Sequence, residues 1–153
     1  MGSRNLYTTE KETLKKTFGM VLDKRELGRT IFLRFFEKYP QHIELFPYAR
    51  GKTVEELKDN RAVAMHGAKV LDVFDRAIQH LDDLTPLLTE LTQLGSKHIE
   101  WKTKPEYFEE MRDCVVLSIK ESLNLKEDAV KIWYRVYDIL TDAMIKGIVP
   151  DTE

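Results

Sequence analysis

Two histidines occupy helical positions at which the surrounding pattern calls for an apolar side chain. His98 follows Leu91 and Leu94 at spacings of seven and four residues, so the three share one face if the segment is helical. His66 follows Val63 in a second apolar series. A neutral imidazole is the commonest protein metal ligand, and a buried ring has two nitrogens to satisfy. Both residues are therefore candidate ligands.

Motif spacing narrows the chemistry that these histidines can perform. A single histidine on an apolar face is more often a core residue that hydrogen-bonds to a carbonyl group. Two on facing helices favour a shared ligand, because each would otherwise lose a buried hydrogen bond worth about 1–3 kcal/mol. The sequence has no His-Glu-x-x-His, Glu-x-x-His or Cys-x-x-Cys, which argues against zinc protease, di-iron and iron–sulfur sites. Iron in a haem between His66 and His98 fits what remains.

Large apolar side chains are available to form the walls of a flat cofactor site, although the same pattern also suits an ordinary core. The candidate wall residues are Phe32, Phe46, Val70, Leu94, Phe108 and Met111. The other histidines, His42 and His80, lie near predicted helix ends, where we expect them to be solvated. Cys114 lies on an apolar helical face and is expected to pack there, not to act as a nucleophile.

Composition predicts one globular domain over residues 1–153, with 42% hydrophobic and 33% charged residues. A formal net charge of -2 gives no bulk attraction to nucleic acid. No apolar run approaches the ~20 residues of a membrane helix, and no nucleophile or phosphate-loop motif suggests an enzyme. The lone cysteine rules out an internal disulfide framework and favours a reducing compartment, the cytoplasm.

Helical periodicity between prolines predicts an all-α protein of six to eight helices. A capping box at Thr9 and Glu12 starts the first helix, whose buried face extends to Leu22. Further helices are expected over residues 24–39, 53–81 and 85–98, from Pro105, and after a second capping box at Asn124. Residues 1–7 are left out of the fold as a flexible N-terminus or an expression remnant.

Four landmarks in the right order resemble the globin family over most of the chain. They are "FFEKYPQHIELF", "MHGAKVL", "LTQLGSKH" and the glycine pair Gly28 and Gly67. The resemblance implies a globin fold around haem b, with His98 as the proximal iron ligand and His66 as the distal histidine. It also implies that Phe46 stacks on the haem and that the two glycines let their helices cross closely.

The 32-residue spacing of the histidines and "LGSKH" resemble the neuroglobin-like branch, whose members often use both histidines as axial ligands. Such a protein would act in redox sensing, electron transfer or oxygen sensing. A five-coordinate globin that binds O2 or another diatomic gas, as carrier, store or sensor, is the alternative. A haem-free helical interaction module is a third reading. A redox partner and a homodimer are both left open.

Three neighbours of the histidines carry further expectations. Phe32 cannot donate a hydrogen bond, so it leaves His66 without a polar partner opposite it. Lys69, one turn beyond His66, either reaches a haem propionate or is an ordinary solvated lysine. Trp101 either shields the haem edge as a nearby aromatic residue or packs against the protein, and packing is favoured.

Overall fold

The structure is a computed structural model that describes residues 6–149, and every regular element within that range is helical. The predicted all-α class with six to eight helices is confirmed. The elements follow one another as α1 (Thr8–Phe18), α2 (Lys24–Lys38), the 3-10 helix η1 (Pro40–Leu45), α3 (Val54–Leu57), α4 (Arg61–Gln79), α5 (Thr85–His98), α6 (Pro105–Leu123) and α7 (Glu127–Ile148). Across the described range, none of the helices has the length and apolar character needed to cross a membrane.

The predicted helix over residues 53–81 is wrong, because two separate N-caps divide it. The Thr53 hydroxyl accepts a hydrogen bond from the Glu56 amide and starts α3, which ends at Leu57. The Asn60 side chain then accepts from the amides of Ala62 and Val63 and starts α4. Each cap satisfies amide groups that have no partner inside their own helix, so the segment forms two separate helices, α3 and α4, instead of one.

Both predicted capping boxes are also wrong. The amide of Tyr7 donates to the Glu10 carboxylate over 2.8 Å, which places the start of α1 before Thr9. Asn124 instead ends α6 in the left-handed conformation, with φ at 54°, a position that asparagine tolerates better than most residues.

The edges of the predicted first element differ from the structure in two further places. Leu22 is 98% exposed, because α1 ends at Phe18 and the chain turns away from the core. Leu6, within the segment set aside from the fold, is buried in the core. Residues 1–5 lie outside the described part of the chain.

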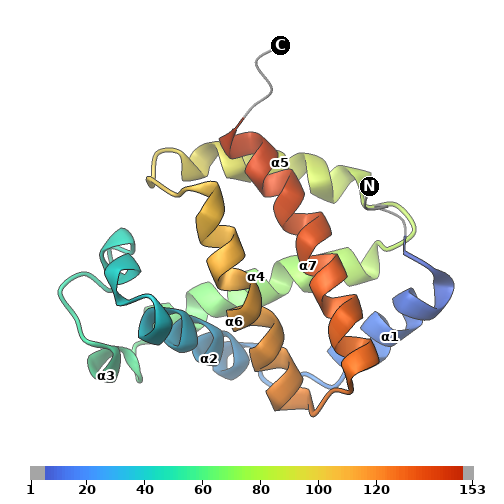
Figure 1. Cartoon of the computed structure of the whole chain (residues 1–153), viewed down its shortest axis with the longest axis horizontal. Coiled ribbons are helices and arrows are strands. Elements are labelled where there is room, and N and C mark those ends of the chain that lie inside the picture. Colours follow the sequence, from blue (N-terminus) through green and yellow to red (C-terminus); the bar gives the residue numbers. More distant parts are fainter. Residues whose placement is uncertain (1–5, 150–153) are drawn as a thin grey trace.

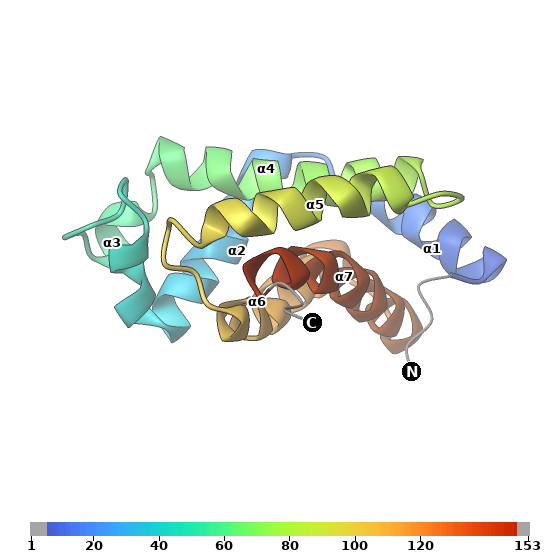
Figure 2. The same cartoon turned by 90° about the horizontal axis from the view of Figure 1, so that it is seen from above.

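The helices pack in two layers, with α4 and α5 lying across α6 and α7 in Figure 2, while α1 and α2 flank them (Figures 1 and 2). The larger apolar cluster surrounds the fully buried Trp133, whose Nε1 donates to the Thr17 hydroxyl over 2.9 Å. A second cluster gathers side chains from α2, η1, α3, α4 and α6, among them Phe32, Phe35, Phe36, Ile43, Leu57, Val63 and Cys114. Val70 and Met111 pack against both clusters.

Two pairs of helices cross closely, α2 with α4 and α5 with α7, and each crossing depends on a pair of glycines. A Cβ added at Gly67 would lie 2.2 Å from the Gly28 carbonyl carbon, which confirms the predicted close approach of α2 and α4. A Cβ at Gly95 would lie 1.9 Å from the Met144 carbonyl oxygen, and one at Gly147 would lie 1.9 Å from that of Thr92. The second crossing, between α5 and α7, was not predicted.

Candidate functional site

His98, the last residue of α5, has a defined tautomer. Its Nδ1 lies 2.8 Å from the Leu94 carbonyl oxygen, one turn earlier. A carbonyl can only accept a hydrogen bond, so Nδ1 carries the proton and Nε2 keeps a free lone pair. Burial lowers the pKa of His98 below 6.5, although the Leu94 carbonyl opposes this shift. His98 therefore presents a neutral nitrogen donor near pH 7.

His66 lies on the inner side of α4 and is also neutral. Burial is the main cause that lowers the pKa of His66 to about 4, and the charges of Lys69 and His98 lower it further. Its ring stacks on Phe32, with the ring centres 4.5 Å apart. The two imidazoles are thus carried by α4 and α5, His66 in the second turn of α4 and His98 at the end of α5.

Tyr48 is a polar partner of His66 that the sequence analysis missed. Its hydroxyl oxygen lies 2.8 Å from His66 Nδ1, so the expectation that His66 lacks such a partner is wrong. Burial raises the pKa of Tyr48, which keeps the hydroxyl protonated. A hydroxyl can donate or accept, so this contact is compatible with either tautomer of His66. The signal in the sequence was an aromatic residue two positions after Phe46 in the corner following η1.

The structure brings several of the predicted wall residues to the two histidines. The Phe46 ring lies 5.6 Å from the His66 ring and meets Phe32 edge-on at 5.8 Å. Phe108, from α6, lies 5.8 Å from the His98 ring.

The other predicted site residues are not aromatic, and each is placed by a different kind of contact. Leu94 contributes its carbonyl group to His98, and its side chain packs on the larger cluster. Val70 and Met111 lie where the two clusters meet. Lys69 is exposed and acts on His66 through its charge.

The prediction that His42 is solvated is wrong, whereas Trp101 is partly exposed and also in contact with a histidine. His42 is only 7% exposed, and its Nε2 lies 3.0 Å from the Glu110 carboxylate, so it links η1 to α6 instead of facing solvent. Trp101 is 53% exposed, and its ring meets the His98 ring edge-on with centres 4.8 Å apart. Neither position was apparent from α-helical periodicity, because His42 lies in the 3-10 helix η1 and Trp101 lies in the turn after α5.

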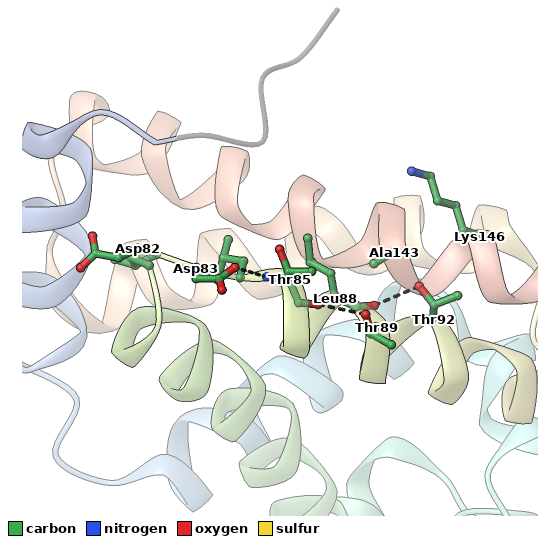
Figure 3. A pocket seen from close by; sticks show the side chains of 10 residues that line it. Asp82, Asp83, Thr85, Leu88, Thr89, Thr92, Ala143 and Lys146 are labelled. Atoms are coloured by element: carbon green, nitrogen blue, oxygen red, sulfur yellow. Dashed lines mark hydrogen bonds between the residues drawn. The ribbon is translucent and has the colours of Figure 1, made fainter.

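A cleft of about 390 Å³ lies elsewhere, between the start of α5 and the end of α7 (Figure 3). Asp82 and Asp83 stand at one end of it, and Lys146 stands at the other. The hydroxyls of Thr89 and Thr92 donate to carbonyl groups of their own helix. The cleft contains no histidine and is separate from the His66–His98 site.

The donor set at the two histidines suits a metal that brings most of its ligands with it. Across residues 6–149, no three His, Cys, Asp or Glu side chains come together where they could hold a metal ion. Two neutral imidazoles with aromatic rings beside them are instead the kind of donors that haem iron accepts from proteins.

Comparison with known proteins decides the family. The profile of the globin family matches residues 29–144. The chain belongs to the globin family. This globin is 30% identical over 126 residues to the polymeric globin component P3 of Glycera dibranchiata, a match that covers 80% of this chain and 82% of that one. It is 32% identical over 124 residues to the neuroglobin of Tetraodon nigroviridis, covering 78% and 77% of the two chains.

Solved structures agree with this globin over nearly its whole length. A Drosophila melanogaster structure described as a hexa-coordinate hemoglobin has a TM-score of 0.84 and 25% identity, and the match covers 92% of this chain and 94% of that one. A hexacoordinated heme protein from an anhydrobiotic tardigrade has a TM-score of 0.83 at 24% identity, covering 94% and 96%. Globins bind haem, and the donor set of this globin fits that group.

Proposed function

We propose that this globin binds haem b between His98 and His66, that both histidines act as axial ligands, and that it works inside the cell in electron transfer, redox sensing or oxygen sensing. The observation that carries the proposal is the state of the two imidazoles. Both are neutral, and each has its Nδ1 in a hydrogen bond, which directs Nε2 to the other side of the ring. Nε2 of His98 is necessarily a lone-pair donor.

The tautomer of His66 decides whether it can be the sixth ligand. When His66 Nδ1 donates to the Tyr48 hydroxyl, Nε2 has a lone pair and can bind a metal. When the hydroxyl donates to Nδ1, Nε2 carries a proton and can instead donate a hydrogen bond to a gas ligand. Phe32, stacked on His66, offers no competing donor or acceptor. Tyr48 is therefore the residue whose hydrogen bond most directly biases His66 between these roles.

The bound haem would supply a one-electron redox couple and a site for small ligands. The protein would position it with His98, restrict water with Phe46 and Phe108, and use His66 to compete with external ligands. The hexa-coordinate description of the Drosophila relative supports the six-coordinate form. A ligand that must displace His66 binds with an apparent affinity reduced by the fraction of open sites.

The absorption spectrum of the unliganded ferrous protein tests this proposal, with His66→Leu and His98→Ala as variants and His80→Leu as the control for an exposed histidine. We expect sharp low-spin bands in the parent and in His80→Leu, which disappear in His66→Leu. His98→Ala should retain haem poorly. A parent spectrum that matches His66→Leu, with broad high-spin bands, would refute six-coordination.

The second candidate is a five-coordinate globin that reversibly binds O2 or another diatomic gas. The Tyr48 contact favours it if the hydroxyl is the donor, because His66 then presents an N–H group. Tyr48→Phe separates the two readings. Removing a hydrogen bond worth about 0.5–1.5 kcal/mol should change the six-coordinate fraction or the gas dissociation rate roughly two- to tenfold. If the six-coordinate fraction changes, His66 binds the metal in the parent; if only gas dissociation accelerates, the five-coordinate reading is favoured.

A further inference from the structure

Residues 97–104, from the end of α5 to the start of α6, form a surface segment that the haem site alone does not explain. We call it the basic loop. Ile99 and Trp101 are 52% and 53% exposed, although both are large and hydrophobic. Lys97, Lys102 and Lys104 are exposed beside them. In Figure 1 this connection runs along the edge of the molecule.

The charge of the basic loop contrasts with that of the whole chain. The chain has a formal net charge of -2, but this segment has three lysines and a single acidic residue, Glu100. Elsewhere, Lys11 and Lys24 form ion pairs with aspartates. Within the described residues, no ion pair occupies the three lysines of the basic loop. Their charges are available to an external partner.

The basic loop is held to His98 by two kinds of contact. The amides of Trp101 and Thr103 both donate to the His98 carbonyl oxygen over 3.1 Å. The Trp101 ring meets the His98 imidazole edge-on at 4.8 Å. Lys102 adopts a positive φ of 58°, which is costly for a lysine and completes this turn. An exposed indole is thereby fixed between solvent and the candidate iron ligand.

We propose that the basic loop docks an acidic one-electron carrier protein, with Ile99 and Trp101 as apolar contacts and the three lysines as a positive rim. Complementary charge accelerates encounter, and exposed aromatic residues are favoured anchors of protein interfaces. The inference rests on the proposed redox function, for which it names the partner class. One electron leaves the carrier, which is oxidised, and the haem protein is reduced by one electron; no bond forms or breaks.

Binding of flavodoxin, an acidic flavin protein, provides the first test. The full haem-loaded chain would be titrated by calorimetry at two salt concentrations. We expect binding that weakens as salt increases, and a loss of at least tenfold in affinity in the triple variant Lys97→Glu, Lys102→Glu, Lys104→Glu. The matched control changes Lys15, Lys16 and Lys131, which are exposed on α1 and α7, to Glu and should keep the parent affinity within about twofold.

The contribution of Trp101 is measured by Trp101→Ala, with Tyr7→Ala as the control for another exposed aromatic residue. Trp101→Ala should weaken flavodoxin binding and slow reduction of the ferric protein by flavodoxin hydroquinone, whereas Tyr7→Ala should change neither. Equal binding by the two triple variants would overturn the proposal. So would tighter binding to the basic protein cytochrome c than to flavodoxin.

A separate comparison shows whether the haem itself uses these lysines. If haem carboxylates occupy them, flavodoxin will bind the haem-free chain and not the loaded one, which also overturns the proposal. Coordination is read independently from the ferrous spectrum. A five-coordinate spectrum with binding that still depends on the lysines would refute the proposed coordination and leave the docking surface supported.

Discussion

Replacing Gly67 by alanine should destabilise this protein, although the same change in most helices is stabilising. Alanine in a helix interior is usually favoured over glycine by about 1 kcal/mol. At Gly67, however, the new Cβ would lie 2.2 Å from the carbonyl carbon of Gly28 and 2.4 Å from its Cα. These are backbone atoms of α2, which cannot rotate away, so α2 and α4 would have to separate by more than an ångström.

The expected cost follows from these opposing effects. Overpacking a tight contact costs about 1–3 kcal/mol, and a clash with backbone atoms should fall in the upper part of that range, about 2–3 kcal/mol, from which the helical preference for alanine subtracts about 1 kcal/mol. The net loss should be roughly 1–2 kcal/mol, which corresponds to a fall of about 2–8 °C in melting temperature for a chain of this size. Phe32 lies on α2 and His66 on α4, so the separation should also disturb their ring stacking.

Urea denaturation of the haem-free protein measures the loss of stability without a contribution from haem binding. Gly19→Ala is the control, because Gly19 has a helical φ of -60° at the end of α1 and its added Cβ would meet only the preceding turn of its own helix, at 3.2 Å from the Lys15 carbonyl oxygen. The double variant with Gly28→Ala should lose less than the two single losses combined, because the helices are already apart. A Gly67→Ala protein as stable as the parent would refute the tight crossing.

Three further predictions concern other parts of the structure. Gly95→Ala should lower the melting temperature by a similar amount, since its Cβ would lie 1.9 Å from the Met144 carbonyl oxygen; an unchanged melting curve would contradict the α5–α7 crossing. Thr17→Val removes the partner of the buried Trp133 Nε1 and should cost about 1–3 kcal/mol in urea unfolding, whereas Thr9→Val, on the exposed side of α1, should cost little. Burial lowers the pKa of His66 from 6.5 to about 4, so the unfolded chain binds more protons than the folded chain between these pH values. The free energy of unfolding of the haem-free protein should therefore be highest above pH 6.5 and should fall as the pH decreases toward 4. The loss is on the order of 3 kcal/mol and should be largely absent in His66→Leu; an identical acid slope in both proteins would show that His66 is not buried in its neutral form.

Much of the fold follows from local sequence. The apolar series on α2, with Leu27, Ile31 and Phe35 in one row, predicted a helix within one residue of its observed end, because helical spacing and burial are local properties. Pro105 similarly marked the first residue of α6. Local signals failed where two of them competed. Thr53 and Asn60 both cap helices, and apolar spacing alone did not reveal the break between them.

The sequence by itself determined the two candidate histidines, because each stood out from a helical pattern in its own segment, and its resemblance to the globins singled out the tight pair Gly28 and Gly67. Only the tertiary structure decided what surrounds them. Tyr48 reaches His66 from the corner after η1, and Trp101 turns outward against His98, because the irregular backbone between helices sets both directions. Gly95 and Gly147 are 52 residues apart in sequence and reveal their role only where α5 meets α7. Helical periodicity specifies which face of a helix is buried, whereas the partner of that face depends on how the whole chain packs.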